Sequence, residues 1–454
     1  MNRRYLLRAS AVASAGTLLT PVLAGSAAAQ RVSAMPEAGA AAPSSTDTFF
    51  QDAELNYNFL TLLGFARYGL VDVGSCLAIA SQITDGDPAS VVQAFTAAGD
   101  QFAAVGDTAA AAGHLVSARN AYLQAATYTF TATYFLDAMG APERFAPVWR
   151  RQQALWDQGA ALLDPPMEKV RIPYPDTTST QVPRQATTLP GYFFKVDDSG
   201  RPRPVLIFNN GSDGSLPFAW AVAIAPALER GYNCLTFYGP GQGLALVDQG
   251  LSFRPDWEQV ITPVVEYALS RPEVDPARVA LMGDSQGGYW VPRAVAFEHR
   301  VAAAVADPGV WDVSTSWGLA KFPPPLLQLF NAGNKTAFDQ ALQQGLASDP
   351  AAAATLAFRS RPFGFSSAFD TYTAVKQYAL TNDIVDQIRC PMLIASPEGE
   401  QFWPGQSEQL YQALPGPKTV VAFTRAEGAD LHCEPKAPGL RAQRIFDWLD
   451  ATLA

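Results

Sequence analysis

One stretch constrains the fold of this chain more than any other, because a strand pattern, a glycine-flanked serine and a helix pattern follow one another directly. Residues 279–282 form the kind of short apolar run that becomes a buried strand, and the residues after Gly287 recur at helical spacing. Between the two patterns stands Gly283-Asp-Ser-Gln-Gly287. A Gly-x-Ser-x-Gly sequence in this setting holds its serine on a strained turn, which only small neighbours can accommodate. The stretch predicts a nucleophilic Ser285 beside the backbone amide of Gln286; the alternative is a glycine-rich turn without chemistry.

A nucleophilic serine on such a turn requires an acid and then a histidine further along the chain. The chain contains three histidines. His114 falls in a helical region, and His299 ends the helix that begins at Ser285, about 20 Å away at 1.5 Å per residue. His432 follows the last strand pattern, in a loop that can reach over the carboxyl edge of a sheet. We therefore predict that His432 is the general base.

The acid is expected just beyond the strand pattern at residues 391–396. Two carboxylates stand there, those of Glu398 and Glu400. The acid of such a site accepts a hydrogen bond from the histidine ring, which fixes the tautomer and stabilises the imidazolium.

An oxyanion hole needs a second backbone donor besides the amide of Gln286. The expected source is the loop at residues 209–214, which follows the first central strand pattern. We predict the amide of Ser212 for this role, with those of Gly211 and Asp213 as alternatives.

The balance of charges limits the partners of the chain. Its 42 Asp and Glu residues outnumber its 32 Lys and Arg residues, for a net charge of −10. Such an acidic body argues against nucleic acids and anionic membrane surfaces. We expect no metal, since paired histidine or cysteine spacings are absent, and no cofactor, since no glycine-rich loop continues into a phosphate-binding motif. The expected partner is a small-molecule substrate, and the sequence is compatible with a homo-oligomer.

Residues 1–29 are typical of a twin-arginine signal peptide. Two adjacent arginines precede an alanine-rich apolar stretch, which ends in three alanines before Gln30. We expect cleavage there and a secreted or periplasmic protein without stable membrane association, since no other stretch reaches transmembrane length. Four cysteines do not make a disulfide framework in a chain this long, and Cys390 and Cys433 are expected about 20 Å apart, too far to bridge.

The periodicity of apolar residues divides the chain beyond a linker at residues 30–46. Residues 47–165 are helical without strand signals, which predicts a helical N-terminal domain. Residues 166–310 alternate strands and helices after an antiparallel pair, residues 311–388 turn helical again, and residues 389–454 restore the strands. We predict an α/β fold with a mostly parallel central sheet, in which residues 311–388 form a helical lid over the serine.

Four segments carry a resemblance to a known family: Arg271-Pro-Glu-Val-Asp-Pro-Ala-Arg278, Gly287-Gly-Tyr-Trp-Val-Pro-Arg293, Gly239-Pro-Gly-Gln-Gly243 and Glu427-Gly-Ala-Asp-Leu-His432. With them the chain resembles the α/β-hydrolase superfamily, in particular the branch with fermentation-respiration switch-type esterases, dihydroxypseudooxynicotine hydrolase and fungal heptaketide-shortening hydrolases. The resemblance implies an α/β-hydrolase fold from about residue 168 onward, with the same roles for serine, acid and histidine. The family's spacing at the acid favours Glu400, which Pro404 follows, over Glu398.

Two positions depart from the family pattern. The acid is Glu where the family often has Asp, and Tyr238 stands where Asp often precedes the Gly-Pro-Gly loop. The family includes ester hydrolases and enzymes that cleave carbon–carbon bonds beside a ketone. The carbon–carbon hydrolases use a further acid after the serine's helix, where Asp307 and Asp312 are the nearby candidates, and neither matches the pattern cleanly.

The sequence thus predicts an exported serine hydrolase that cleaves an ester through Ser285, His432 and Glu400. Aromatic residues in the lid suggest an apolar or aromatic acyl group, although they can equally form the core of the lid. These residues are Trp311, Trp317, Phe330, Phe363, Phe365 and Tyr372. The alternative function is hydrolysis of a carbon–carbon bond beside a ketone, in a β-diketone or polyketide-like substrate. A peptidase, or a non-catalytic binding protein on the same scaffold, is less favoured.

Overall fold

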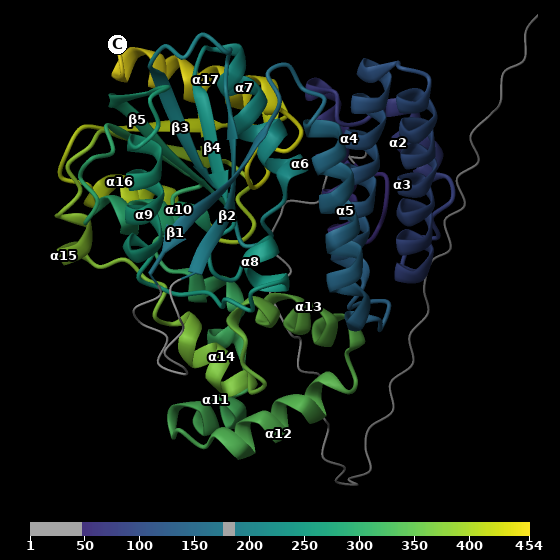
Figure 1. The fold of residues 1–454 in the computed structure, drawn as a ribbon. Helices are drawn as coiled ribbons and strands as arrows, with labels where there is room; N and C mark the ends of the chain where they lie inside the picture. Colours follow the sequence, from purple (N-terminus) through teal and green to yellow (C-terminus); the bar gives the residue numbers. More distant parts are fainter. Residues whose placement is uncertain (1–47, 176–186) are drawn as a thin grey trace, which may run out of the picture.

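An eight-stranded sheet forms the centre of the protein. The computed structural model describes residues 48–175 and 187–454, so the predicted signal peptide and linker lie outside the described residues. The strands follow the spatial order β1-β2-β4-β3-β5-β6-β7-β8 (Figure 1). They are β1 (Glu168–Tyr174), β2 (Thr187–Phe194), β3 (Arg203–Asn209), β4 (Asn233–Phe237), β5 (Val274–Asp284), β6 (Ala303–Asp307), β7 (Met392–Pro397) and β8 (Lys418–Phe423).

Most of the sheet is parallel. Strands β4, β3, β5, β6, β7 and β8 run parallel to their neighbours, whereas β1 and β2 form an antiparallel pair and β2 joins β4 antiparallel. Every residue of β4 and β6 is buried, as expected for parallel strands with both faces covered. The predicted α/β fold with a mostly parallel central sheet is confirmed. The carboxyl ends of the parallel strands meet at one edge, where such sheets place their sites.

Helices cover the sheet on both faces. On one face, α17 (Pro438–Thr452) packs against β6. On the other, α10 (Gly287–Val295) packs against β5 and β6 and contacts α9 (Glu258–Leu269). The helix α16 (Gln406–Ala413) packs against β7 and β8, and the short α8 (Gly243–Val247) follows β4.

The helical segment after β3 is interrupted. It consists of α6 (Leu216–Ala219), the π-helical turn η4 (Trp220–Ile224) and α7 (Ala225–Glu229). Pro226 accounts for the interruption, because it has no backbone N–H to donate to the carbonyl of Val222, as an α-helix requires. That carbonyl accepts a hydrogen bond from Nη1 of Arg441 in α17 instead, at 2.7 Å.

The N-terminal part is helical, as predicted. It contains α1 (Ala53–Phe65), α2 (Val73–Ala80), α3 (Pro88–Ala111), α4 (Leu115–Ala132) and α5 (Phe145–Ala160), and Figure 1 shows α2–α5 side by side beyond one edge of the sheet. Their buried side chains belong to one continuous apolar core with those of the sheet. Short 3₁₀ helices complete the fold: η1 (Ala66–Tyr68), η2 (Thr133–Phe135), η3 (Pro142–Arg144), η5 (Val313–Trp317), η6 (Leu319–Lys321), η7 (Arg361–Phe363) and η8 (Arg425–Glu427).

Tyr238, one of the two departures from the family pattern, ties the sheet to these helices. Its hydroxyl donates to Oε1 of Gln153 in α5 at 2.7 Å, and its ring lies edge-on to that of Trp149, with centroids 5.3 Å apart. A buried phenol needs such a partner. Tyr238 therefore stabilises the contact between α5 and the segment after β4.

Besides η5, η6 and η7, the predicted lid contains five α-helices. They are α11 (Pro324–Asn331), α12 (Lys335–Leu346), α13 (Pro350–Ser360), α14 (Ala368–Val375) and α15 (Asn382–Val385). Figure 1 shows α11–α14 gathered together beyond the sheet. Arg361, just after α13, pairs with Asp137 of the N-terminal part at 2.6 Å, so the two helical parts contact each other directly.

The aromatic side chains of the lid mostly pack against one another. The ring of Trp317 lies 5.3 Å from that of Phe363 and 5.8 Å from that of Tyr372, and each of the three is at most 4% exposed. Phe330 is also buried, whereas Trp311 and Phe365 are partly buried. Of the two interpretations of these residues, the structure favours the core of the lid.

The described residues contain no helix that is both long enough and apolar enough to cross a membrane. All four cysteines are free.

Candidate active site

Ser285 occupies the strained turn that its sequence predicts. It lies between β5 and α10 with φ of 55°, in the left-handed region that residues other than glycine rarely adopt. A Cβ on Gly283 would lie 2.2 Å from the carbonyl oxygen of Gly287, and a Cβ on Gly287 would lie 2.9 Å from that of Asn209. Both glycines are therefore sterically required, and the turn presents the serine at the carboxyl edge of the sheet.

Three of the predicted residues form one hydrogen-bonded series. Oγ of Ser285 lies 2.9 Å from Nε2 of His432, and Nδ1 of His432 lies 2.8 Å from Oε2 of Glu400. With Nδ1–H donating to the carboxylate, Nε2 is free to accept the serine proton. Glu398 lies elsewhere, since its Oε2 accepts the backbone N–H of Arg425 at 2.8 Å. The structure thus brings Glu400, not Glu398, to the histidine.

The environment of Glu400 keeps its carboxylate ionised. Burial alone would raise its pKa, but the charge and hydrogen bond of His432 outweigh burial, and the backbone N–H groups of Phe402 and Trp403 donate to the same carboxylate. The net effect lowers the pKa of Glu400. His432 responds in the opposite sense: burial would lower its pKa, but Glu400 above all raises the pKa above 6.5.

The backbone and ring of His432 are held from several sides. Its backbone N–H donates to Oε1 of Gln401 at 3.0 Å, and its backbone carbonyl accepts from the hydroxyl of Tyr57 in α1 at 2.9 Å. The rings of Phe402 and Trp403 lie 4.7 and 5.6 Å from the imidazole. Gln401 stands between residues that the sequence singled out, whereas Tyr57 is 375 positions away and no local pattern points to it.

The loop after β3 lies directly against Ser285. A Cβ on Gly211 would lie 2.7 Å from Cβ of Ser285. The amide of Gly211 donates to the side chain of Asn210 at 2.9 Å, which removes Gly211 from the possible oxyanion donors. Within residues 48–175 and 187–454, the amides of Gln286, Ser212 and Asp213 donate to no protein group, so all three remain available to a ligand.

Gln242 braces this loop from the neighbouring Gly-Pro-Gly-Gln-Gly segment. Its Nε2 donates to the carbonyls of Asn210 and Gly211 at 2.7 and 2.6 Å, and its Oε1 accepts the backbone N–H of Gly239 at 2.9 Å. The segment that contributed to the family resemblance therefore has a defined part in the site. It orients the loop that carries Ser212.

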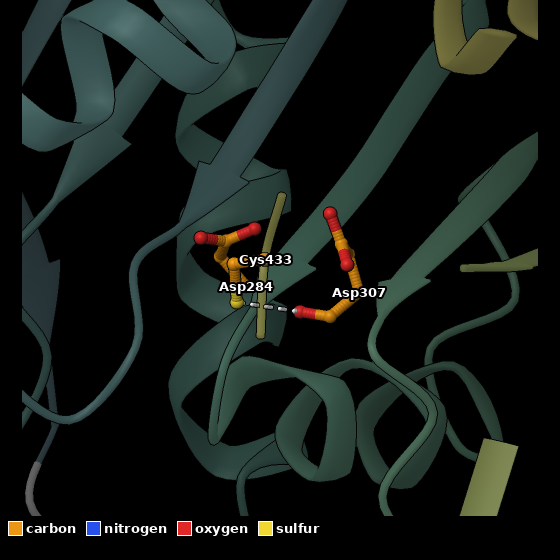
Figure 2. Close-up of side chains that lie close together, drawn as sticks. All are labelled: Asp284, Asp307 and Cys433. Atoms are coloured by element: carbon orange, nitrogen blue, oxygen red, sulfur yellow. Dashed lines mark hydrogen bonds between the residues drawn. The ribbon is translucent and has the colours of Figure 1, made fainter. Parts of the chain in front are cut away.

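A buried ion cluster lies next to Ser285 and His432. We call the charged side chains of Arg441, Asp284, Asp307 and Glu434 the Arg441 cluster. Nε of Arg441 donates to Asp307 at 2.6 Å and lies 3.3 Å from Glu434, and Nη2 donates to Asp284. The Cys433 thiol contacts the backbone carbonyl of Asp307 at 3.5 Å, and Figure 2 shows Asp284, Asp307 and Cys433 close together. These three could in principle surround a metal ion, but Arg441 already supplies positive charge to both aspartates.

Further charged residues interact with Asp213, whose amide was one of the alternatives for the oxyanion hole. Burial raises the pKa of Asp213, next to Ser212, against the opposing charges of Arg359 and His432. Burial, Asp52 and Asp213 raise the pKa of Glu54 in α1 to about 7. Both residues are exposed at the surface, so solvent screens part of these effects. Glu54 of α1, Asp213 of the loop after β3 and Arg359 of α13 thus interact electrostatically, although they lie far apart in the chain.

The remaining candidates lie apart from the serine. His299 contacts the carbonyl of Ala296 at 2.9 Å at the end of its own helix, and His114 stands exposed before α4. Asp312 accepts the backbone N–H of Ser314 at 2.8 Å as the cap of η5.

Comparisons with known proteins agree with this architecture. Hydrolyase poxO of Penicillium oxalicum is 30% identical over 429 residues, which cover 89% of this chain and 98% of that protein. The protein named alpha/beta hydrolase psoB of Aspergillus fumigatus is 30% identical over 431 residues, covering 88% and 93%. The crystal structure of 2,6-dihydroxy-pseudo-oxynicotine hydrolase has the same fold, with a TM-score of 0.65 at 19% identity over 86% of this chain and 95% of that one. No family model matches the chain.

The chain belongs to the α/β-hydrolase family. It is an enzyme of the hydrolase class, in the branch of the family to which its sequence motifs pointed.

Proposed function

We propose that this enzyme is a serine hydrolase that works through an acyl-enzyme. Ser285 attacks the carbonyl carbon while His432 accepts the serine proton, and Glu400 stabilises the resulting imidazolium. The amides of Gln286 and Ser212 donate to the oxyanion. His432 then returns its proton to the leaving group and activates the water that releases the acyl group. The observation that carries the proposal is the series of 2.8 and 2.9 Å contacts from Glu400 through His432 to Ser285.

An ester of an apolar or aromatic acyl group is the favoured substrate. The aromatic residues of the lid do not support this substrate, because they pack into the core of the lid. The apolar surface beside the reacting groups comes from Phe402, which is 41% exposed and lies against the His432 ring. We assign the acyl group to this surface.

Carbon–carbon hydrolysis is the second candidate, and a specific observation favours it. Cleavage beside a ketone releases a carbanion or enolate, which must gain a proton from a nearby acid. Asp307 is held by Arg441 and Asp312 caps a helix, so neither is free for this role. Burial and the charges of Asp52 and Asp213 raise the pKa of Glu54, which favours a proton on this carboxyl. Glu54 is therefore the acid that we assign to this alternative.

A comparison of two substrates tests the proposal and separates its two forms. We would measure turnover of an aryl ester and a matched aryl β-diketone by the chain beginning at Gln30, with Ser285→Ala as the control. Cleavage of the ester alone identifies an esterase. Diketone cleavage at comparable efficiency identifies a carbon–carbon hydrolase, and Glu54→Gln should then slow the diketone more than the ester. Undiminished turnover in Ser285→Ala would contradict the mechanism.

We also propose that the enzyme is exported by a twin-arginine pathway and cleaved before Gln30. The support is the pattern of residues 1–29. Replacing Arg3 and Arg4 with lysine should retain the full-length chain inside the cell, whereas the unchanged chain should be recovered outside the cytoplasm with Gln30 at its N-terminus. Two results would favour the other functions. Failure of a fluorophosphonate to label Ser285 would favour a non-catalytic binding role, and faster cleavage of a peptide amide than of the ester would favour a peptidase.

A further inference from the structure

Each acid of the Arg441 cluster is connected to one of the reacting groups. Asp284 directly precedes Ser285, and Glu434 comes two residues after His432. The backbone carbonyl of Asp307 accepts the N–H of Ser285 at 2.7 Å. Arg441 therefore joins the serine turn and the histidine loop through their neighbouring side chains.

The cluster has more negative than positive groups. It contains three carboxyls and one guanidinium, and none of these side chains is more than 1% exposed. Three ionised carboxylates would leave two uncompensated negative charges in a dry interior. Isolated buried charges are so costly that such groups take up a proton instead.

Unfilled hydrogen-bond acceptors lead to the same conclusion. Asp284 Oδ2, Asp307 Oδ1 and both oxygens of Glu434 are buried without a donor. A proton on Glu434 would supply a donor to Asp307, which is close enough to share it. Burial, together with the charge of Asp307, raises the pKa of Glu434 well above its usual value, and burial raises that of Asp284 to about 7.

The histidine loop is strained where it meets the cluster. Cys433 and Glu434 have φ values of 58° and 48°, two consecutive non-glycine residues in the left-handed region. Such a conformation is unfavourable for residues with a side chain and persists only where the surroundings impose it. Two contacts anchor these residues. The Glu434 carboxyl lies 3.3 Å from Nε of Arg441, and the Cys433 thiol contacts the backbone carbonyl of Asp307, as Figure 2 shows.

We propose that Glu434 carries a proton that it shares with Asp307, and that the Arg441 cluster is a positioning unit that aligns Ser285 with His432 and sets the pH range in which His432 works. The inference rests on the proposed roles of Ser285 and His432. The charges of Asp284 and Asp307 both act to raise the pKa of His432. A protonated Glu434 carries no charge, so it does not change the net charge of the cluster.

Other groups that face His432 must be kept unchanged in any test of this idea. Glu400 contacts its ring, Tyr57 of α1 contacts its backbone, and the charge of Asp213 reaches it from the loop after β3. Cys433 follows it in the chain, and burial raises the pKa of this thiol well above its usual value, so it stays neutral.

The pH dependence of kcat/KM for the aryl ester tests the proposal in the full mature chain. Glu434→Gln mimics a protonated carboxyl, so we expect it to fold and to keep the acid limb of the profile at the wild-type pH. Asp307→Asn removes a charge near His432 and should move the acid limb to lower pH by about half a unit or more. A merely structural role for the cluster would change stability without moving the acid limb. An unmoved limb in Asp307→Asn, or an equal shift in Glu434→Gln, would overturn the proposal.

A second measurement does not depend on catalysis. The infrared difference spectrum of wild type minus Glu434→Gln at neutral pH should contain the C=O stretch of a protonated carboxyl. Absence of that band, or a Glu434→Gln chain that fails to fold, contradicts a protonated Glu434. If Ser285→Ala kept full turnover, the proposed function would fail while the infrared test still decided the state of Glu434.

Discussion

The hydroxyl of Tyr57, in the first helix, donates a hydrogen bond of 2.9 Å to the backbone carbonyl of His432, in the loop after the last strand. The same helix approaches this loop so closely that a Cβ on Gly64 would lie 1.9 Å from the carbonyl oxygen of Pro435. Helix α1 of the N-terminal part therefore packs directly against the loop that holds the histidine.

Removing this hydroxyl should weaken catalysis more than folding. We expect Tyr57→Phe to lower kcat/KM by about fivefold, because a hydrogen bond of this kind contributes about 1 kcal/mol and its loss frees the histidine loop. Tyr122→Phe is the matched control, since it removes a 2.8 Å bond to Asp107 within the N-terminal helices. Steady-state kinetics and thermal unfolding of both variants provide the measurement. Equal kinetic effects in the two variants would show that Tyr57 has no specific link to the site.

Replacing Glu398 and Glu400 one at a time should distinguish their roles. Glu400→Gln loses the acceptor that orients His432, so we expect kcat to fall by about 10³- to 10⁴-fold with little change in KM. Glu398→Gln keeps an oxygen for the backbone N–H of Arg425 and should stay within about twofold of wild type. Comparable losses in both variants would argue against Glu400 as the acid of the site.

The pH profile should show activity and stability moving in opposite directions. The base must be neutral, and Glu400 raises the pKa of His432 above 6.5, so kcat/KM should rise with pH along an acid limb centred above pH 6.5. The raised pKa of His432 stabilises the fold below pH 6.5, and this contribution is lost as pH rises through the raised value. The lowered pKa of Glu400 stabilises the fold above pH 4.5 and is lost as pH falls through the lowered value.

The pair therefore stabilises the fold most between these limits, on the acid side of the active range. Chemical unfolding across pH 4–8, beside kcat/KM over the same range, checks this. In Glu400→Gln the free energy of unfolding should no longer be highest between these two limits. An acid limb at or below pH 6.5 in the wild type would contradict the assignment of His432 as the base.

The serine turn should tolerate no side chain on its flanking glycine. In Gly283→Ala the new Cβ would meet a backbone oxygen at 2.2 Å, so the turn must shift. We expect destabilisation of about 1–3 kcal/mol and loss of most activity. Gly74→Ala, in α2, has nothing within 4 Å of the added Cβ and should be neutral or stabilising by up to about 1 kcal/mol. Circular dichroism melts and ester turnover distinguish the two, and an active Gly283→Ala would refute the steric argument.

Much of the fold was predictable because its signals are local. The alternation of strands and helices predicted for residues 166–310 is present, and the strand–turn–helix pattern around Ser285 formed as expected. His432 followed from eliminating two other histidines by their position along helices. Tyr57 and Arg441 were missed, because each acts on residues far away in the chain and neither carries a motif.

The sequence by itself determined the order of strands and helices, the serine turn and the histidine that meets it. These depend on periodicity and on the steric needs of a few consecutive residues. Only the tertiary structure decided between Glu398 and Glu400, whose carboxylates are two residues apart but point to different partners. It alone assembled the Arg441 cluster, because a buried charge is satisfied by whatever groups the packing of sheet and helices places within hydrogen-bond distance.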